Sequence, residues 1–157
     1  MARIIIMEDD PDEGVLLSQL LERVGHEVMV FPDAQSTLDH LEVSGADVLL
    51  SDIFVKKENR LVPDGGVRLI STIRQLWRVD WTRLPIIAIS GGVSIQGGAS
   101  PLRIARDLGA DALFEKPVPI DELHLTIEEL VSNRLNPFRG RNNTSSRVSK
   151  RPSGLMG

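Results

Sequence analysis

The amino-acid sequence predicts an α/β fold in which a parallel β-sheet is covered by helices on both faces. Two observations support this prediction. Short apolar segments with the length of strands alternate along the chain with longer segments whose apolar residues recur at helical spacing. Several of the short segments are apolar throughout, which is typical of strands buried on both faces of a parallel sheet. We therefore expect five strands that alternate with five helices in one folded unit.

The predicted elements follow one another along the whole folded part of the chain. The strands are expected at residues 3–7, 27–31, 48–51, 85–89 and 112–115. The helices are expected at residues 11–24, 33–44, 67–76, 102–108 and 120–131, and a glycine follows the first, second and fourth of them. A long polar connection is expected between the third strand and the third helix, and a glycine-rich connection after the fourth strand.

The first predicted helix opens on a proline, which fits the first helical position because the missing N–H group would have no partner there. Asp10 is then the N-cap, and Glu13 is the third helical residue in an arrangement close to a capping box. Asp12 and Glu13 also favour the positive end of the helix dipole. These three acids have a structural explanation, whereas Glu8 and Asp9 at the preceding strand end have none.

The composition suits one domain in a reducing environment. The chain has 157 residues, of which 41% are hydrophobic, and it contains no cysteine. Disulfides and cysteine-based zinc sites are therefore excluded. The sequence shows neither a signal peptide nor an apolar stretch of membrane-spanning length, so we expect a cytoplasmic protein without a membrane partner. His26, His40 and His124 are dispersed, and we interpret them as surface or helix residues.

The charge is distributed unevenly along the chain. The 24 residues from position 134 onward include six basic residues and no acidic one, which leaves 12 basic and 22 acidic residues in the remainder. We expect a folded domain at residues 1–136 and a basic, disordered tail at residues 137–157, because the tail has no periodic apolar positions. The tail also lacks aromatic residues beyond Phe138, so we expect no nucleic-acid partner.

Polar side chains follow four of the five predicted strands. Glu8 and Asp9 follow the first strand, Asp52 the third, Ser90 the fourth and Lys116 the fifth. The carboxyl ends of parallel strands meet at one edge, so these side chains are expected to lie close together. Clustered carboxylates repel one another unless a cation intervenes, and oxygen ligands of this kind suit Mg2+. Asp52 could then take a phosphoryl group whose oxygens Lys116 and Ser90 would hold.

This constellation resembles the receiver domain of two-component response regulators, and the resemblance covers roughly residues 3–133. It implies a flavodoxin-like (βα)5 fold with strand order 2-1-3-4-5. It also implies that Asp52 accepts a phosphoryl group from a histidine kinase or a histidine phosphotransfer protein, and that Ser90 and Lys116 bind the phosphoryl oxygens. The Mg2+ ligands would be Asp9, Asp52, Glu8 mainly through water, and the backbone carbonyl of Phe54.

Three features depart from the family pattern. The connection between residues 53 and 64 is longer and more charged, the connection from residue 90 to residue 100 is rich in glycine, and Leu113 stands where the family has a switch aromatic. Phe114 cannot simply replace that aromatic, because adjacent strand residues face opposite sides of the sheet.

The resemblance implies a single-domain signalling protein that acts through an unidentified downstream protein. We expect no enzymatic activity beyond its own phosphorylation and dephosphorylation. The alternative is a pseudo-receiver that binds partners without phosphorylation, although none of the motif residues is missing. A phosphatase with an Asp-x-Asp motif is disfavoured because Phe54 occupies the position of the second acid. A flavin-binding module is disfavoured because the acidic residues after the first strand would repel the flavin phosphate.

Overall fold

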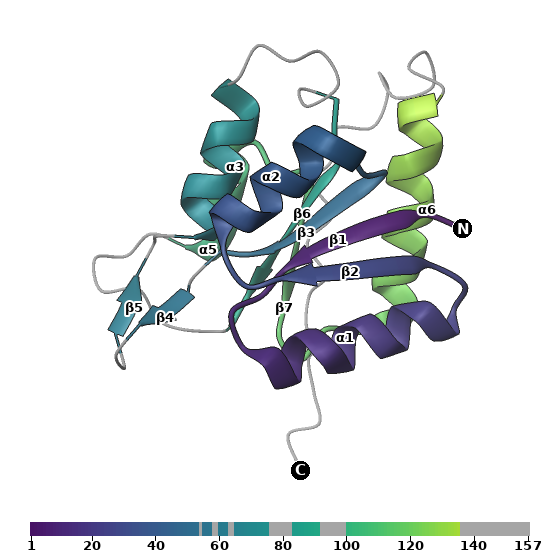
Figure 1. The fold of residues 1–157 in the computed structure, drawn as a ribbon, viewed down its shortest axis with the longest axis horizontal. Helices are drawn as coiled ribbons and strands as arrows, with labels where there is room; N and C mark the ends of the chain where they lie inside the picture. The colour runs from purple at the N-terminus through teal and green to yellow at the C-terminus, as the bar shows by residue number, and fades with distance from the viewer. Residues whose placement is uncertain (54, 58–59, 63–64, 76–82, 92–99, 136–157) are drawn as a thin grey trace.

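The computed structural model describes residues 1–53, 55–57, 60–62, 65–75, 83–91 and 100–135 (Figure 1). Its main sheet has five parallel strands in the order β2-β1-β3-β6-β7, which confirms the expected order 2-1-3-4-5. The strands of this sheet are β1 (Arg3–Met7), β2 (Glu27–Phe31), β3 (Val48–Asp52), β6 (Ile86–Ser90) and β7 (Ala112–Glu115).

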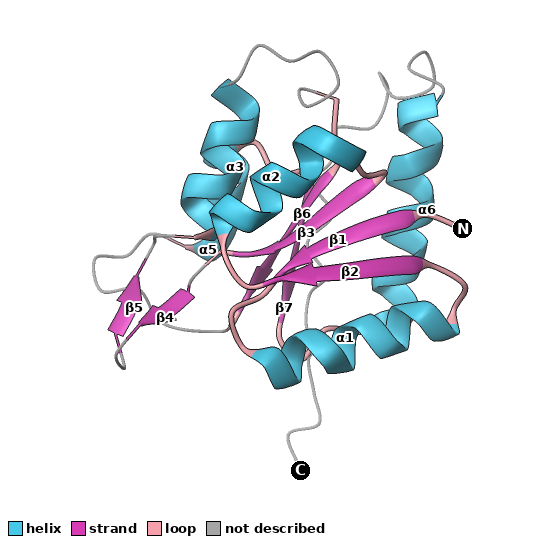
Figure 2. Ribbon diagram, in the orientation of Figure 1, coloured by secondary structure: helices cyan, strands magenta, loops and turns pink. Residues whose placement is uncertain are grey.

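Helices cover both faces of the sheet, as predicted (Figure 2). One face carries α2 (Ala34–Ser44), α3 (Gly66–Gln75) and α5 (Pro101–Leu108). The other face carries α1 (Pro11–Arg23) and α6 (Ile120–Leu135). None of the helices in the described part of the chain has the length and apolar character that crossing a membrane would require.

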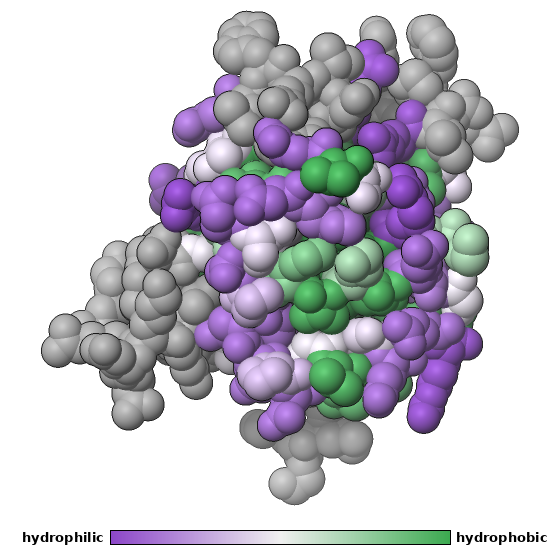
Figure 3. Space-filling model, in the orientation of Figure 1, coloured by the Kyte–Doolittle hydropathy of each residue, from purple (hydrophilic) through white to green (hydrophobic). Residues whose placement is uncertain are grey.

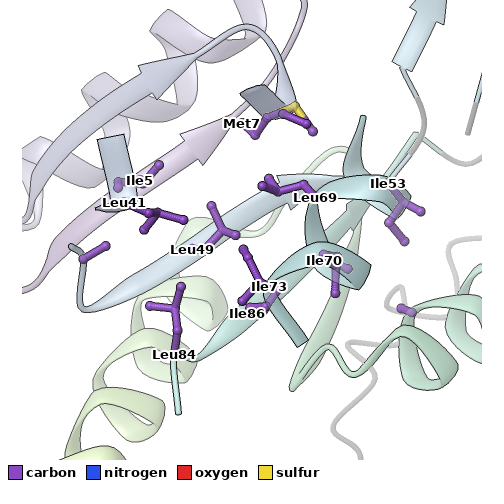
Figure 4. Packing of buried hydrophobic residues seen from close by; sticks show 14 of the residues in the cluster. Ile5, Met7, Leu41, Leu49, Ile53, Leu69, Ile70, Ile73, Leu84 and Ile86 are labelled. Atoms are coloured by element: carbon purple, nitrogen blue, oxygen red, sulfur yellow. The ribbon is translucent and has the colours of Figure 1, made fainter. Parts of the chain in front are cut away.

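Two apolar cores lie on the two faces, because successive strand residues point to opposite sides. Ile5 and Leu49 face the core under α2, α3 and α5, which Figure 4 shows from close by. Ile4 and Leu50 face the core under α1 and α6. All four side chains are at most 3% exposed, and burying one such side chain contributes about 1.5–3 kcal/mol. Leu113 and Phe114 also lie in opposite cores, as the alternation requires.

The edge strand β2 is less buried than the central strands. Figure 3 shows apolar side chains gathered between α1 and α2, over this edge, where Met29 and Val30 are exposed. Every residue of β3 and β6 is buried, because each of these strands has a neighbour on both sides and a helix on both faces. The chain therefore holds Asp52 and Ser90, the last residues of β3 and β6, in the most buried strands of the sheet.

A small hairpin interrupts the connection between β3 and α3. The sequence predicts only a long polar connection here, whereas the structure forms β4 (Val55–Lys57) and β5 (Arg60–Val62) in it. The two strands pair antiparallel and make a separate two-stranded sheet. The rest of this connection, residues 76–82, most of the connection after Ser90 and the predicted basic tail lie outside the described residues.

One histidine is buried where the sequence-based interpretation placed it at the surface or in a helix. His26 is only 5% exposed and precedes β2, so its interpretation as a surface or helix residue was wrong. The amide of Ala2 donates a hydrogen bond to His26 Nδ1 at 3.1 Å, and His26 Nε2 lies 2.8 Å from Nδ1 of His124 on α6. With the Ala2 donor in place, neutral His26 carries its proton on Nε2 and donates it to His124. An additional proton on either ring would set two donors against each other.

Acid is therefore expected to destabilise the fold through His26. Burial and then the nearby His124 lower the pKa of His26, and the opposing effect of Glu128 is smaller. The unfolded chain binds more protons, so the unfolding free energy should fall as the pH drops below about 6.5. Melting curves of the wild type and of His26→Gln across this range check the prediction. The wild type should lose stability more steeply on acidification, and equal slopes would contradict it.

Candidate functional site

The polar residues at the strand ends meet at the carboxyl edge of the main sheet. β1 pairs with β3, β3 with β6 and β6 with β7, and all of these pairs are parallel. Asp52 and Ser90 end their strands, while Glu8 and Lys116 directly follow β1 and β7. The structure thus brings these four residues together at one edge, as the sequence analysis expected.

Lys116 is the centre of the site. Its ammonium group donates hydrogen bonds to Asp52 Oδ2 at 3.1 Å, to Glu8 Oε2 at 3.2 Å and to Glu13 Oε2 at 2.5 Å. An ammonium group has three protons, so these three carboxylates use its full donor capacity. The side chains of Glu8 and Asp52 are 4% and 6% exposed, so two of the three acceptors are nearly withdrawn from water.

The electrostatics of the site follow from three carboxylates that share one cation. Burial, and then the charge of Asp52, raise the pKa of Glu8 to about 8, although Lys116 opposes this shift. Burial disfavours the charged form of Lys116, but the hydrogen bond to Glu13 and the charges of Asp52 and Glu8 outweigh it and raise the pKa of this ammonium. The site therefore holds Lys116 firmly charged and leaves an excess of negative charge on the carboxylates.

The carboxylates suit a hard divalent cation. Within the described residues, the carboxylate oxygens of Glu8, Glu13 and Asp52 can all lie within 4.8 Å of one another. An all-oxygen donor set with excess negative charge is the kind that Mg2+ prefers, with water completing its coordination. Asp9 is not a member of this group, and Phe54 lies outside the described residues, so their predicted metal contacts remain predictions.

Glu13 is the residue that the sequence analysis missed. The predicted N-cap is confirmed, because Asp10 Oδ1 accepts from the amides of Asp12 at 2.9 Å and Glu13 at 3.2 Å. However, the Asp10 amide donates to Glu8 Oε1 and not to Glu13, so the reciprocal bond of a capping box is not made. The Glu13 carboxylate points to Lys116 instead. No signal in the sequence distinguishes these two uses of a glutamate at the third helical position.

Ser90 has a buried hydroxyl group without a hydrogen-bond partner in the part of the chain that the structure describes. The residue is 1% exposed, and its Oγ makes no hydrogen bond within the described part of the chain. Buried hydroxyl groups are nearly always hydrogen-bonded, so an unpartnered one at a polar edge indicates a group that binds there. Ser90 ends β6, next to the strand that ends in Asp52, so we expect that group to be one that Asp52 also binds.

An apolar groove adjoins the carboxylates. It lies between α1 and the segment that leads from β7 into α6, and its volume is about 500 Å³. Its walls include Leu16, Leu17 and Ile120, while Glu13 and Lys116 line the polar part. Leu16 is 59% exposed, which is unusual for a leucine on a helix that is otherwise packed against the sheet. The groove therefore presents an apolar surface beside Glu13 and Lys116.

The fold and this set of residues define a doubly wound parallel sheet whose third strand ends in an aspartate that is paired with a lysine. Residues 4–128 match the family model of the response regulator receiver domain, and the chain belongs to that family. The resemblance stated from the sequence motifs is thereby confirmed. Receiver domains are signalling domains of two-component systems, and they typically use Mg2+ at their acidic residues.

The chain is similar to several known regulators. It is 29% identical over 131 residues to the transcriptional regulatory protein CpxR of Escherichia coli K12, covering 83% of this chain and 50% of CpxR. It is 27% identical over 148 residues to the transcriptional regulatory protein RprY of Bacteroides fragilis, covering 94% of this chain and 55% of RprY. The chain therefore spans about half the length of these curated relatives.

Solved structures agree with the fold. A CheY-like response regulator receiver domain protein from Methanospirillum hungatei JF-1 is 25% identical with a TM-score of 0.69, covering 87% of this chain and 98% of that one. A response regulator structure from Chloroflexus aurantiacus also has a TM-score of 0.69, at 22% identity, and covers 83% of this chain and 98% of the other.

Proposed function

We propose that the protein is a phosphorylation-controlled switch in which Asp52 accepts a phosphoryl group in the presence of Mg2+. The contact of Asp52 with Lys116 carries the proposal most directly. One carboxylate oxygen of Asp52 accepts from the Lys116 ammonium at 3.1 Å. The Ser90 hydroxyl, which has no partner among the described residues, lies at the end of the adjacent strand. A nucleophilic carboxylate, a fixed cation and a free hydroxyl are the groups that phosphoryl transfer to a side chain requires.

The transfer can be written for the residues present. An oxygen of the Asp52 carboxylate attacks the phosphorus of the donor, and a new oxygen–phosphorus bond forms as the bond from phosphorus to the donor breaks. The electron pair of that bond leaves with the donor. Lys116 balances charge on the transferred oxygens, and Ser90 donates a hydrogen bond to one of them.

Mg2+ fits the carboxylates that the site presents. We propose that Asp52 and Glu8 hold it, Glu8 mainly through water, together with Asp9 and the backbone carbonyl of Phe54. The bound ion would supply the additional positive charge that a dianionic phosphoryl group needs beside several carboxylates.

We propose a histidine kinase or a histidine phosphotransfer protein as the donor and a further protein as the downstream target, with the exchange in the cytoplasm. The pseudo-receiver alternative has no observation in its favour, because Asp52, Lys116 and the acidic residues are all present. Intact mass spectrometry after incubation with a small phosphodonor, with and without Mg2+, tests the proposal. One phosphoryl group should be added only when Mg2+ is present, and an unchanged mass under both conditions would refute it.

The apolar groove beside Asp52 suggests where a protein donor binds. Leu16→Arg would place a charge on the exposed part of this groove without touching the carboxylates, so transfer from a phosphohistidine protein should slow by tenfold or more. Phosphorylation by a small phosphodonor should be unchanged. Val43→Arg, at an apolar position on α2 that is 87% exposed, serves as the control. Equal slowing with both kinds of donor would show that the groove acts on the site itself and not on docking.

A further inference from the structure

All three protons of the Lys116 ammonium group are used in hydrogen bonds in this structure. Its three hydrogen bonds go to Glu8, Glu13 and Asp52, and the bond to Glu13 is the shortest, at 2.5 Å. A phosphoryl group on Asp52 would need Lys116 as a hydrogen-bond donor. One of the present acceptors must therefore give way when the phosphoryl group arrives.

Burial decides which acceptor can leave. The side chain of Glu8 is 4% exposed and that of Glu13 is 50% exposed, while Asp52 is the group that becomes modified. A half-exposed carboxylate can turn out into solvent without moving its neighbours, whereas a buried one is enclosed by packed atoms that would have to shift first. Glu13 also stands on α1, on an element separate from the strands that carry Asp52 and Ser90.

We propose that Glu13 is a positioning residue of this site: its carboxylate competes with the phosphoryl group for the Lys116 ammonium and so restrains phosphorylation of Asp52. The inference rests on the proposed function. In the unmodified protein, Glu13 holds Lys116 at the edge of the site and adds a negative charge where an anionic donor must approach. Removal of that charge should release Lys116 to the donor oxygens and speed the transfer.

The chain offers a matched control for this residue. Asp12 stands next to Glu13 in the first turn of α1, and both amides donate to the same oxygen of the Asp10 cap. Asp12→Asn and Glu13→Gln therefore remove one negative charge each from the same helix end, with the same cost to the helix dipole. Of these two acids, only Glu13 has a hydrogen bond to Lys116 among the described contacts.

The first measurement does not depend on phosphorylation. Lys116 is modified with a small amine-reactive reagent, and its initial rate of modification is followed by peptide mass spectrometry. Glu13→Gln should raise the rate several-fold over the wild type, and Asp12→Asn should leave it unchanged. Glu13→Asp keeps the charge on a shorter side chain and should behave like Glu13→Gln. If Lys116 is modified at the wild-type rate in Glu13→Asp, then the negative charge at this position controls the rate and the contact with Lys116 does not. The proposal would then be wrong.

The second measurement follows phosphorylation by a small phosphodonor with Mg2+. Glu13→Gln and Glu13→Asp should be labelled several-fold faster than the wild type and Asp12→Asn. Equal rates in Glu13→Gln and Asp12→Asn would overturn the competition while leaving Asp52 as the acceptor. A wild type that takes no label would overturn the proposed function and the competition together. The three results are distinct, so failure of one proposal cannot be mistaken for failure of the other.

Discussion

Asp52→Asn is expected to abolish phosphorylation completely. The substituted amide keeps the shape of the side chain but has no nucleophilic carboxylate oxygen, so no acyl phosphate can form. The substitution also replaces one of the three carboxylates around Lys116 by a neutral amide, so Glu8 and Glu13 supply the negative charge that remains in contact with that ammonium. Intact mass spectrometry with a small phosphodonor and Mg2+ measures the result. The wild type should gain one phosphoryl group and Asp52→Asn none.

A second aspartate shows whether the effect belongs to this position. Asp39 lies on α2, and its carboxylate accepts a hydrogen bond from Gln35 on the surface of the same helix. Asp39→Asn makes the same chemical change away from the carboxyl edge and should be labelled like the wild type. If Asp52→Asn were labelled as strongly as Asp39→Asn, the phosphoryl group would be on another residue.

Gly66→Ala is expected to have the largest effect on the fold and on the site together. A Cβ atom on Gly66 would lie 1.7 Å from the carbonyl oxygen of Asp52 and 2.6 Å from the Cα of Ile53. These neighbours are backbone atoms of the chain that carries Asp52, so they cannot turn away as a side chain would. The start of α3 must separate from the end of β3, which should cost at least about 3 kcal/mol of unfolding free energy.

The same displacement should impair the chemistry. Asp52 would move relative to Lys116, so phosphorylation by a small donor should fall sharply even in the fraction that folds. Gly91→Ala is the control, because a Cβ there meets no atom within 4 Å. Denaturant unfolding and the rate of mass gain measure the two effects. A Gly66→Ala protein that unfolds and labels like Gly91→Ala would show that α3 does not pack against Asp52 this closely.

The sequence by itself determined the strands of the main sheet, the helices between them and the edge at which the site lies, but not the β4–β5 hairpin. Apolar strands such as Val48–Asp52 must be buried on both faces, and alternation with helices makes them parallel. Parallel strands present their carboxyl ends at one edge, so residues 8, 52, 90 and 116 could be assigned to one site without coordinates. The order of the strands came only through the family resemblance, because apolar periodicity says that a strand is buried but not which strand lies beside it.

Only the tertiary structure decided the contacts between segments far apart in the chain. Glu13 and Lys116 are 103 positions apart, and Glu13 fits a capping box as well as it fits an ion pair until α1 is placed against β7. His26 is buried because the end of α1, the start of β1 and α6 converge on it. Gly66 is required because α3 begins against the carbonyl of Asp52. Each of these depends on a distance across the fold, and local propensity and periodicity carry no information about such distances.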